Sequence, residues 1–144
     1  MQRVLGEFAP HLYVLLRIIA GLLFACHGAQ KLFGLFGGMG GQAGAAVPLF
    51  SLMGLAGCIE LVCGPLITLG VLTSYAAFVA SGEMAFAYFM HHFPRGFWPI
   101  SNHGELPVLF CFLFLYIAAN GAMVRRRPPT SMEPAAHETT GIRE

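Results

Sequence analysis

The chain has 144 residues, of which 56% are hydrophobic and only 10% are charged, and its formal net charge is +1. Soluble domains typically carry about 25% charged residues, so this composition excludes an ordinary water-exposed globular domain. A net charge so close to zero also gives no support for a nucleic-acid partner. The sequence therefore predicts an integral membrane protein of the all-α class, with lipid as its first partner.

Four apolar runs are long enough to cross a bilayer, whose hydrocarbon core requires a helix of about 20 residues. The first covers about residues 11–33 and is followed by a glycine-rich segment, and the second covers about 47–70. The third, about 73–91, follows so short a turn that it must lie antiparallel beside the second. A polar, aromatic-rich loop leads to the fourth, about 105–123. The predicted fold is a four-transmembrane-helix bundle, one membrane domain of residues 1–124.

The basic residues outside these runs predict the orientation of the bundle. Arg3 and the arginines at 125–127 flank one side of the predicted membrane domain, whereas Lys31 and Arg95 lie on the other. The positive-inside rule places the more basic side in the cytoplasm. We therefore expect both termini in the cytoplasm of a bacterial inner membrane, with residues 125–144 forming a basic and then disordered tail.

Three ionisable residues lie inside the apolar runs: Arg17, Glu60 and Glu83. A charged side chain at the bilayer centre costs about 2.5–3.5 kcal/mol on insertion scales. We expect Arg17 to pair with Glu60 or with Glu83, and Glu60 is the favoured partner. One arginine cannot neutralise both carboxylates, so we expect the second to be protonated or hydrogen-bonded to a Ser, Thr, Tyr or His. Glu83 is then left without an obvious partner, and His27 is the nearest candidate.

These buried polar residues allow two interpretations. In the first, the polar network only orders the helices of the bundle. In the second, the same residues form a binding site for a ligand or for protons, because the energetic cost of charges in the bilayer is difficult to justify by packing alone. Both interpretations stay open at the level of the sequence.

Histidines gather toward the outer face of the predicted bundle, beside Glu105. Imidazoles with a carboxylate can bind Zn²⁺, Cu²⁺ or haem, but no H-x-x-x-H or H-E-x-x-H motif lies on any span. We therefore expect no metal, and keep a histidine metal site as the weaker alternative. The same residues could instead contact the head of a quinone. The histidines concerned are His27, His91, His92 and His103.

Motifs of an autonomous enzyme are missing from the sequence. The four cysteines, at 26, 58, 63 and 111, contain no C-x-x-C pair and lie in apolar surroundings, which is typical of small buried hydrophobes. There is no activated nucleophile, no cofactor-binding loop and no soluble catalytic domain. Enzyme activity of its own is therefore the least supported function, and the sequence requires no cofactor.

Three segments together resemble the DoxX family and cover nearly the whole hydrophobic region in order. The first is RIIAGLLFACHGAQKLFG at 17–34, and the second is GLAGCIELVCGPLITLG at 54–70, which contains Glu60. The third is FWPISNHGEL at 97–106, which leads into the aromatic run at 110–112. The chain departs from the family pattern at His103, where a second glycine is usual, and after Asn120.

The resemblance implies a four-helix membrane bundle associated with membrane redox systems, since related DoxD proteins are linked to thiosulfate:quinone oxidoreductase. It implies an accessory subunit of a membrane-bound redox or electron-transfer complex, with other subunits as partners and a quinone as the candidate cofactor. The alternative is a non-catalytic structural or assembly subunit. The candidate buried polar site comprises Arg17, His27, Gln30, Lys31, Glu60, Glu83, Asn102 and Glu105.

Overall fold

The computed structural model describes the backbone of residues 2–124 and the side chains of residues 6–121, and within this part of the chain all regular structure is helical. The prediction of an all-α fold is thus confirmed. The predicted tail, residues 125–144, lies outside the described residues. The helices are α1 (Gln2–Phe33), α2 (Leu52–Leu69), α3 (Thr73–Ala87), the short α4 (Pro99–Asn102) and α5 (Glu105–Val124).

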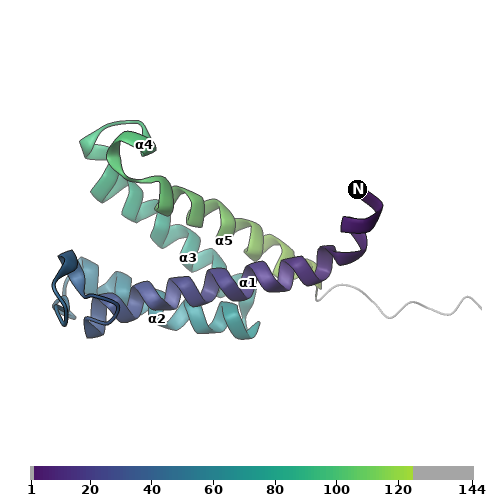
Figure 1. The fold of residues 1–144 in the computed structure, drawn as a ribbon, viewed down its shortest axis with the longest axis horizontal. Coiled ribbons are helices and arrows are strands. Elements are labelled where there is room, and N and C mark those ends of the chain that lie inside the picture. The colour runs from purple at the N-terminus through teal and green to yellow at the C-terminus, as the bar shows by residue number, and fades with distance from the viewer. Residues whose placement is uncertain (1, 125–144) are drawn as a thin grey trace, which may run out of the picture.

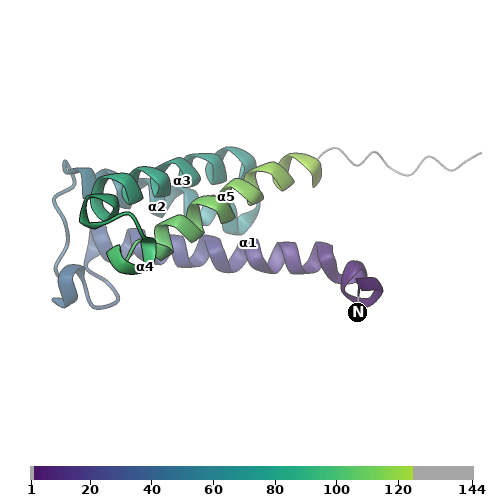
Figure 2. The ribbon, with the colours of Figure 1, turned by 90° about the horizontal axis from the view of Figure 1, so that it is seen from above.

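The long helices form two pairs. Helix α1 packs along α2, helix α3 packs along α5, and a shorter contact between α2 and α3 joins the pairs. The pairs diverge toward the end that carries α4 and the glycine-rich segment (Figure 1). A second view shows that the axes of the four long helices are roughly aligned (Figure 2). Their buried centre contains Phe24, Ile67, Ala77, Phe114 and Ile117.

Close approach of α1 and α2 depends on glycines at the contact. A Cβ added to Gly28 would lie 2.6 Å from the backbone nitrogen of Leu61, and one added to Gly64 would lie 2.7 Å from the backbone nitrogen of Ala25. Small residues at helix contacts are typical of membrane proteins, in which association depends on close packing. These contacts set the antiparallel register of the two helices. The register in turn decides which polar side chains of α1 and α2 can contact each other.

The helix ends differ from the predicted spans for local physical reasons. Helix α1 begins at Gln2 and includes Pro10, and its first turns bend away from the rest of the helix (Figure 1). Helix α2 begins only at Leu52, because Ser51 caps it by accepting a hydrogen bond from the Gly54 amide at 3.0 Å. Helix α3 ends at Ala87 and continues as a single π-helical turn over Tyr88–His92.

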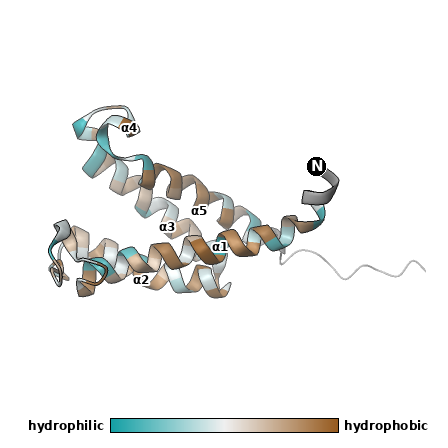
Figure 3. Cartoon of the chain, viewed as in Figure 1, coloured by the Kyte–Doolittle hydropathy of each residue, from teal (hydrophilic) through white to brown (hydrophobic). Residues whose placement is uncertain are grey.

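Large apolar side chains cover much of the surface. The exposed fraction is 65% for Phe78, 66% for Phe112 and 60% for Val62, which is typical of helices that face lipid. Apolar residues dominate the middle of α1 and α5, and polar residues gather near α4 (Figure 3). By length and composition, Gly6–Phe33 and Leu52–Leu69 could each cross a membrane, and Glu105–Gly121 is a shorter apolar helix.

Candidate functional site

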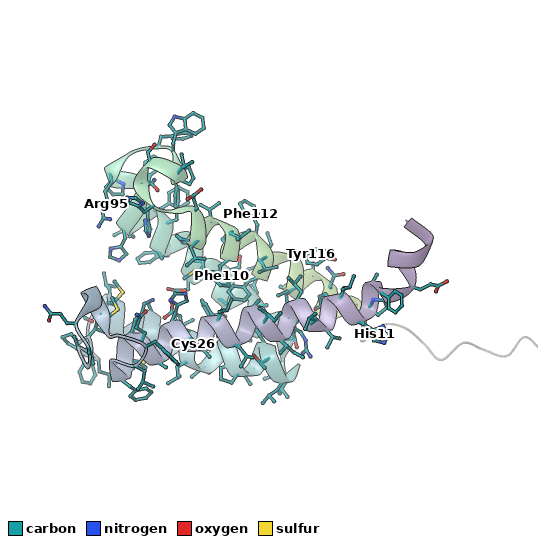
Figure 4. The ribbon with its side chains drawn as sticks, in the orientation of Figure 1. His11, Cys26, Arg95, Phe110, Phe112 and Tyr116 are labelled. Atoms are coloured by element: carbon teal, nitrogen blue, oxygen red, sulfur yellow. The ribbon has the colours of Figure 1, made fainter. Side chains whose placement is uncertain are left out.

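A cavity of about 310 Å³ lies between the two helix pairs. Its polar lining comes from both pairs, with Glu60 on α2 and Glu83 on α3, and its apolar walls include Phe24, Met84 and Phe110. Figure 4 shows Phe110 on the side of α5 that faces α1, whereas Phe112 points outward. The cavity is therefore mainly apolar, with a few polar groups converging on it, which is the usual character of a small-molecule site. The remaining polar lining residues are His27, Gln30, Lys31, His91 and His92.

An ion pair between α1 and α2 forms one polar wall of this cavity. Lys31 Nζ lies 2.6 Å from Glu60 Oε1, and the exposed fractions of the two side chains are 14% and 2%. A short contact between an ammonium and a carboxylate is a charge-assisted hydrogen bond, roughly twice as strong as a neutral one. The charge of Glu60 is therefore compensated from the carboxyl-terminal end of α1, where Lys31 occupies the last turn of the helix.

The predicted partner of Glu60 was wrong. Arg17 lies near the opposite end of the bundle, where its Nη1 donates to Thr73 Oγ1 at 3.4 Å and its guanidinium contacts Gly70. The physical reason is the antiparallel register: Gly28 faces Leu61 and Gly21 faces Gly64. Arg17 is thereby placed opposite the carboxyl-terminal end of α2, whose partial negative charge favours a cation.

Two carboxyl oxygens in the cavity wall have no hydrogen-bond partner within the part of the chain that the structure describes. They are Oε2 of Glu60 and Oε2 of Glu83, and both atoms are buried. Buried polar atoms are nearly always paired, so unpaired ones require an explanation. Glu83 therefore has one buried carboxyl oxygen without a described partner, and Glu60 shares this property despite its ion pair.

Three of the four predicted histidines line the cavity, His27, His91 and His92, but their side chains make different contacts. His27 is half-buried and packs its ring edge-to-face against Phe110, with ring centroids 6.4 Å apart. His92 Nδ1 lies 3.1 Å from the backbone oxygen of Asn102. His91 lines the cavity, whereas His103 does not. No group of three His, Cys, Asp or Glu residues within the described range could hold a metal ion, so the histidine metal alternative finds no support here.

Asn102 and Glu105 were also predicted in the polar site, and the structure places both outside the cavity. Asn102 is 1% exposed, donates from Nδ2 to Gly96 O at 2.7 Å and accepts from the Gly104 amide at 2.8 Å. It holds the connection between α3 and α5 together. Glu105 is exposed in the first turn of α5, where a helix amino terminus favours an acidic residue.

The glycine-rich segment was missed as part of the site. Gln30 Nε2 donates to Gly38 O at 3.1 Å and thereby holds this segment against α1, and Met39 contributes to the cavity wall. The sequence offered a signal in the many glycines that follow Gln30. Six of them, including Gly34 and Gly38, have positive φ, which lets the chain fold back over the helix end.

Comparison with known proteins gives a family match and a similar bacterial protein. The family model described as DoxX matches residues 12–93, a range that contains both Lys31 and Glu60. A protein of Haemophilus influenzae described only as uncharacterized is 40% identical over 121 residues, which is 82% of this chain and 89% of that protein. No solved structure matches the chain.

Proposed function

This chain belongs to the DoxX family of membrane proteins, and on that basis we propose that it is an accessory subunit of a membrane-bound redox complex in the bacterial inner membrane. In this proposal the cavity between the two helix pairs binds the head of a quinone-type molecule. The redox association is implied by the family resemblance, whereas the binding role is argued from the residues of the cavity.

The single observation that carries the binding role is Glu60. It is 2% exposed, lines the cavity and retains an unpaired buried oxygen although Lys31 neutralises it. A carboxylate retained only to hold helices together would be expected to have both oxygens satisfied, because each unpaired buried group costs about 1–3 kcal/mol. A ligand that hydrogen-bonds to Glu60 removes this cost.

The size and walls of the cavity suit an aromatic head with an apolar tail. A volume of about 310 Å³ is at the lower end of the range for small-molecule sites. Phe24, Phe110 and Met84 provide apolar and aromatic surfaces, and Leu55 and Phe86, which also line the cavity, are more than half exposed on the outside of the bundle. Side chains of this kind would allow a tail to continue from the cavity into lipid.

For the topology, we propose four spans with both termini in the cytoplasm. Helix α5 has 20 residues, and α3 with its π-helical turn covers residues 73–92, so each measures close to 30 Å along its axis by the rise of about 1.5 Å per residue. A reporter fused after residue 144 tests the orientation: we expect a fluorescent protein to be active there and a phosphatase that requires the periplasm to be inactive. Phosphatase activity would reverse the proposed orientation.

The alternative function, a structural or assembly subunit without a ligand, draws on the same ion pair. Lys31 and Glu60 link α1 to α2, as a pair that only orders the bundle would do. The two functions differ in whether the cavity is ever occupied.

A binding measurement separates these two functions. The full chain is reconstituted in lipid nanodiscs, and binding of decylbenzoquinone and decylhydroquinone is measured by equilibrium dialysis against empty nanodiscs. We expect saturable binding of at least one of the two, weakened about tenfold or more when Phe110→Trp fills the cavity. The matched control Phe112→Trp lies on the exposed side of the same helix and should bind as the unmodified chain does. Absence of saturable binding to either compound would favour the structural role.

A further inference from the structure

We infer that the cavity selects a ligand whose head donates hydrogen bonds, so that it binds a hydroquinone in preference to the corresponding quinone. This inference rests on the proposed function, because it names the form of the ligand for the same cavity. It follows from the unpaired atoms that the ligand would meet.

Glu60 presents an acceptor that no described residue satisfies. Its Oε1 accepts from the Lys31 ammonium, and its Oε2 is buried without a partner. A carboxylate in an ion pair carries no hydrogen and can only accept hydrogen bonds. A partner of Oε2 must therefore bring a donor, and the Glu60 side chain is shielded from the surface, with an exposed fraction of 2%.

Glu83 presents a second carboxyl group from the opposite helix pair, and a carboxyl group can accept a hydrogen bond whether it is charged or neutral. Its Oε2 is also buried and unpaired, and Glu83 lines the same cavity from α3. No hydrogen bond joins Glu83 to Glu60 among the described residues, so the two carboxyl groups do not satisfy each other. A head with a hydroxyl group could hydrogen-bond to either carboxyl group from within the cavity.

Some of the donors that face the cavity are engaged already, whereas no hydrogen bond among the described residues involves the rings of His27 and His91, which also line it. Gln30 directs its amide nitrogen to the backbone oxygen of Gly38. The His92 Nδ1 must carry a hydrogen, because its neighbour is the carbonyl oxygen of Asn102, and in the neutral ring Nε2 is then an acceptor. Lys31 retains N–H groups beyond the one bound to Glu60.

These donor and acceptor positions distinguish a hydroxyl from a carbonyl. A hydroxyl can donate to Glu60 Oε2 and also accept from the remaining N–H groups of Lys31. A quinone carbonyl can only accept, so it leaves Glu60 Oε2 unpaired. Leaving a buried acceptor unsatisfied weakens binding, so we expect a preference of about tenfold for the hydroxyl form, which corresponds to about 1.4 kcal/mol.

The experiment compares decylhydroquinone with decylbenzoquinone, which carry the same tail, on the full chain in nanodiscs under anaerobic conditions. Dialysis against empty nanodiscs removes the contribution of lipid partitioning. We expect the dissociation constant of decylhydroquinone to be about tenfold lower. Equal binding, or tighter binding of the quinone, would overturn this inference and leave the proposed quinone-type site standing. Binding of neither compound would instead remove the proposed function itself.

Decylammonium serves as a third probe, because an ammonium group also donates hydrogen bonds. Tighter saturable binding of decylammonium than of decylhydroquinone would overturn the inference, since the site would then recognise a cationic amine. We expect decylammonium to bind more weakly, because the cavity already contains the Lys31 ammonium beside Glu60.

A variant of the cavity tests the donor requirement directly. Glu83→Gln keeps the shape of the side chain but adds an N–H₂ donor, so we expect the preference for hydroquinone to fall by about tenfold. Glu105→Gln makes the same chemical change at an exposed position outside the cavity and should leave the preference unchanged. An unchanged preference in Glu83→Gln, with an unfolding temperature like that of Glu105→Gln, would contradict a role for Glu83. If Glu83→Gln does not fold, the comparison of the three probes on the unmodified chain decides the inference alone.

Discussion

Lys31 and Glu60 meet across the α1–α2 contact at 2.6 Å although 29 positions separate them in the sequence. The pair joins the carboxyl-terminal end of α1 to the middle of α2 and forms one polar wall of the cavity between the helix pairs. It divides the polar residues of the protein into a cavity group around Glu60 and Glu83 and a separate contact made by Arg17 at the other end.

The first prediction concerns the stability of this ion pair. Lys31→Met leaves the Glu60 charge buried without compensation, so we expect a loss of about 3–5 kcal/mol in unfolding free energy. Combining Lys31→Met with Glu60→Leu removes both charges and should recover most of that loss. Thermal unfolding in detergent, followed by the circular dichroism of the helices, measures the change. A double variant as unstable as Lys31→Met would contradict the pairing.

The second prediction separates Arg17 from the cavity. Arg17→Met removes the hydrogen bond to Thr73 and should cost about 1 kcal/mol. Because Arg17 and Glu60 share no partner, their changes should add within about 0.5 kcal/mol in a double-mutant cycle with Glu60→Gln. A coupling energy well above about 0.5 kcal/mol would contradict this separation and support the Arg17–Glu60 pair that the sequence predicted.

The third prediction uses glycine to test the register of α1 and α2. Gly28→Ala would place a methyl group 2.6 Å from the Leu61 backbone nitrogen, and we expect overpacking to cost about 1–3 kcal/mol. Gly82→Ala, in α3, meets nothing within 4 Å and should be neutral or should stabilise by up to about 1 kcal/mol. Equal effects of the two substitutions on the unfolding temperature would argue against the close approach at Gly28.

The fourth prediction concerns the connection between α3 and α5. Asn102→Ala leaves Gly96 O and the Gly104 amide without their side-chain partner, so we expect a loss of about 1–3 kcal/mol. Ser101→Ala changes an exposed neighbour and should stay within about 0.5 kcal/mol of the unmodified chain. Limited proteolysis between residues 93 and 104 provides a local measurement, and we expect faster cleavage only in Asn102→Ala. Similar cleavage of both variants would contradict the anchoring role of Asn102.

The fifth prediction concerns His103, the residue that ends α4 with a left-handed backbone. Its φ of 58° lies in the left-handed region, where a residue with a Cβ is disfavoured by about 1–2 kcal/mol. Glycine removes this penalty, but it also gives the unfolded chain more conformational entropy, which offsets part of the gain. We therefore expect His103→Gly to raise the unfolding free energy by up to about 1 kcal/mol. His103→Ala keeps the Cβ and should bring no gain. A destabilised His103→Gly would indicate that the imidazole makes a stabilising contact.

Much of the helical order could be read from the sequence, and the exceptions have local causes. The turn between α2 and α3 falls where the sequence places it, because Gly70 ends α2 with a positive φ of 82°. The first helix extends back to Gln2 through Pro10, because a proline inside a helix removes one backbone hydrogen bond and bends the helix here without ending it. The third ends early in a π-helical turn, which the apolar pattern does not distinguish from an α-helix.

The candidate site was predicted as a set of residues but not as an arrangement. His27, Gln30, Lys31, Glu60 and Glu83 do line one cavity. Three other predicted residues do not line the cavity: Arg17, Asn102 and Glu105. Each was included because it is polar and matches the family pattern, but the polarity of a residue does not show where its side chain points. Asn102 turns toward the backbone of its own loop, a contact that required knowledge of the loop geometry.

By itself, the sequence determined the class of protein, the helical content and the family. These follow from composition and from runs of apolar residues, which act locally and need no knowledge of the partner helix. Only the tertiary structure decided which ionisable groups meet. The glycines at 21, 28 and 64 allow α1 and α2 to interlock in one antiparallel register, and in that register Lys31, not Arg17, reaches Glu60. A shift along the contact would change every polar neighbour while leaving the composition and the apolar runs the same, so the pairing is a property of the packed helices.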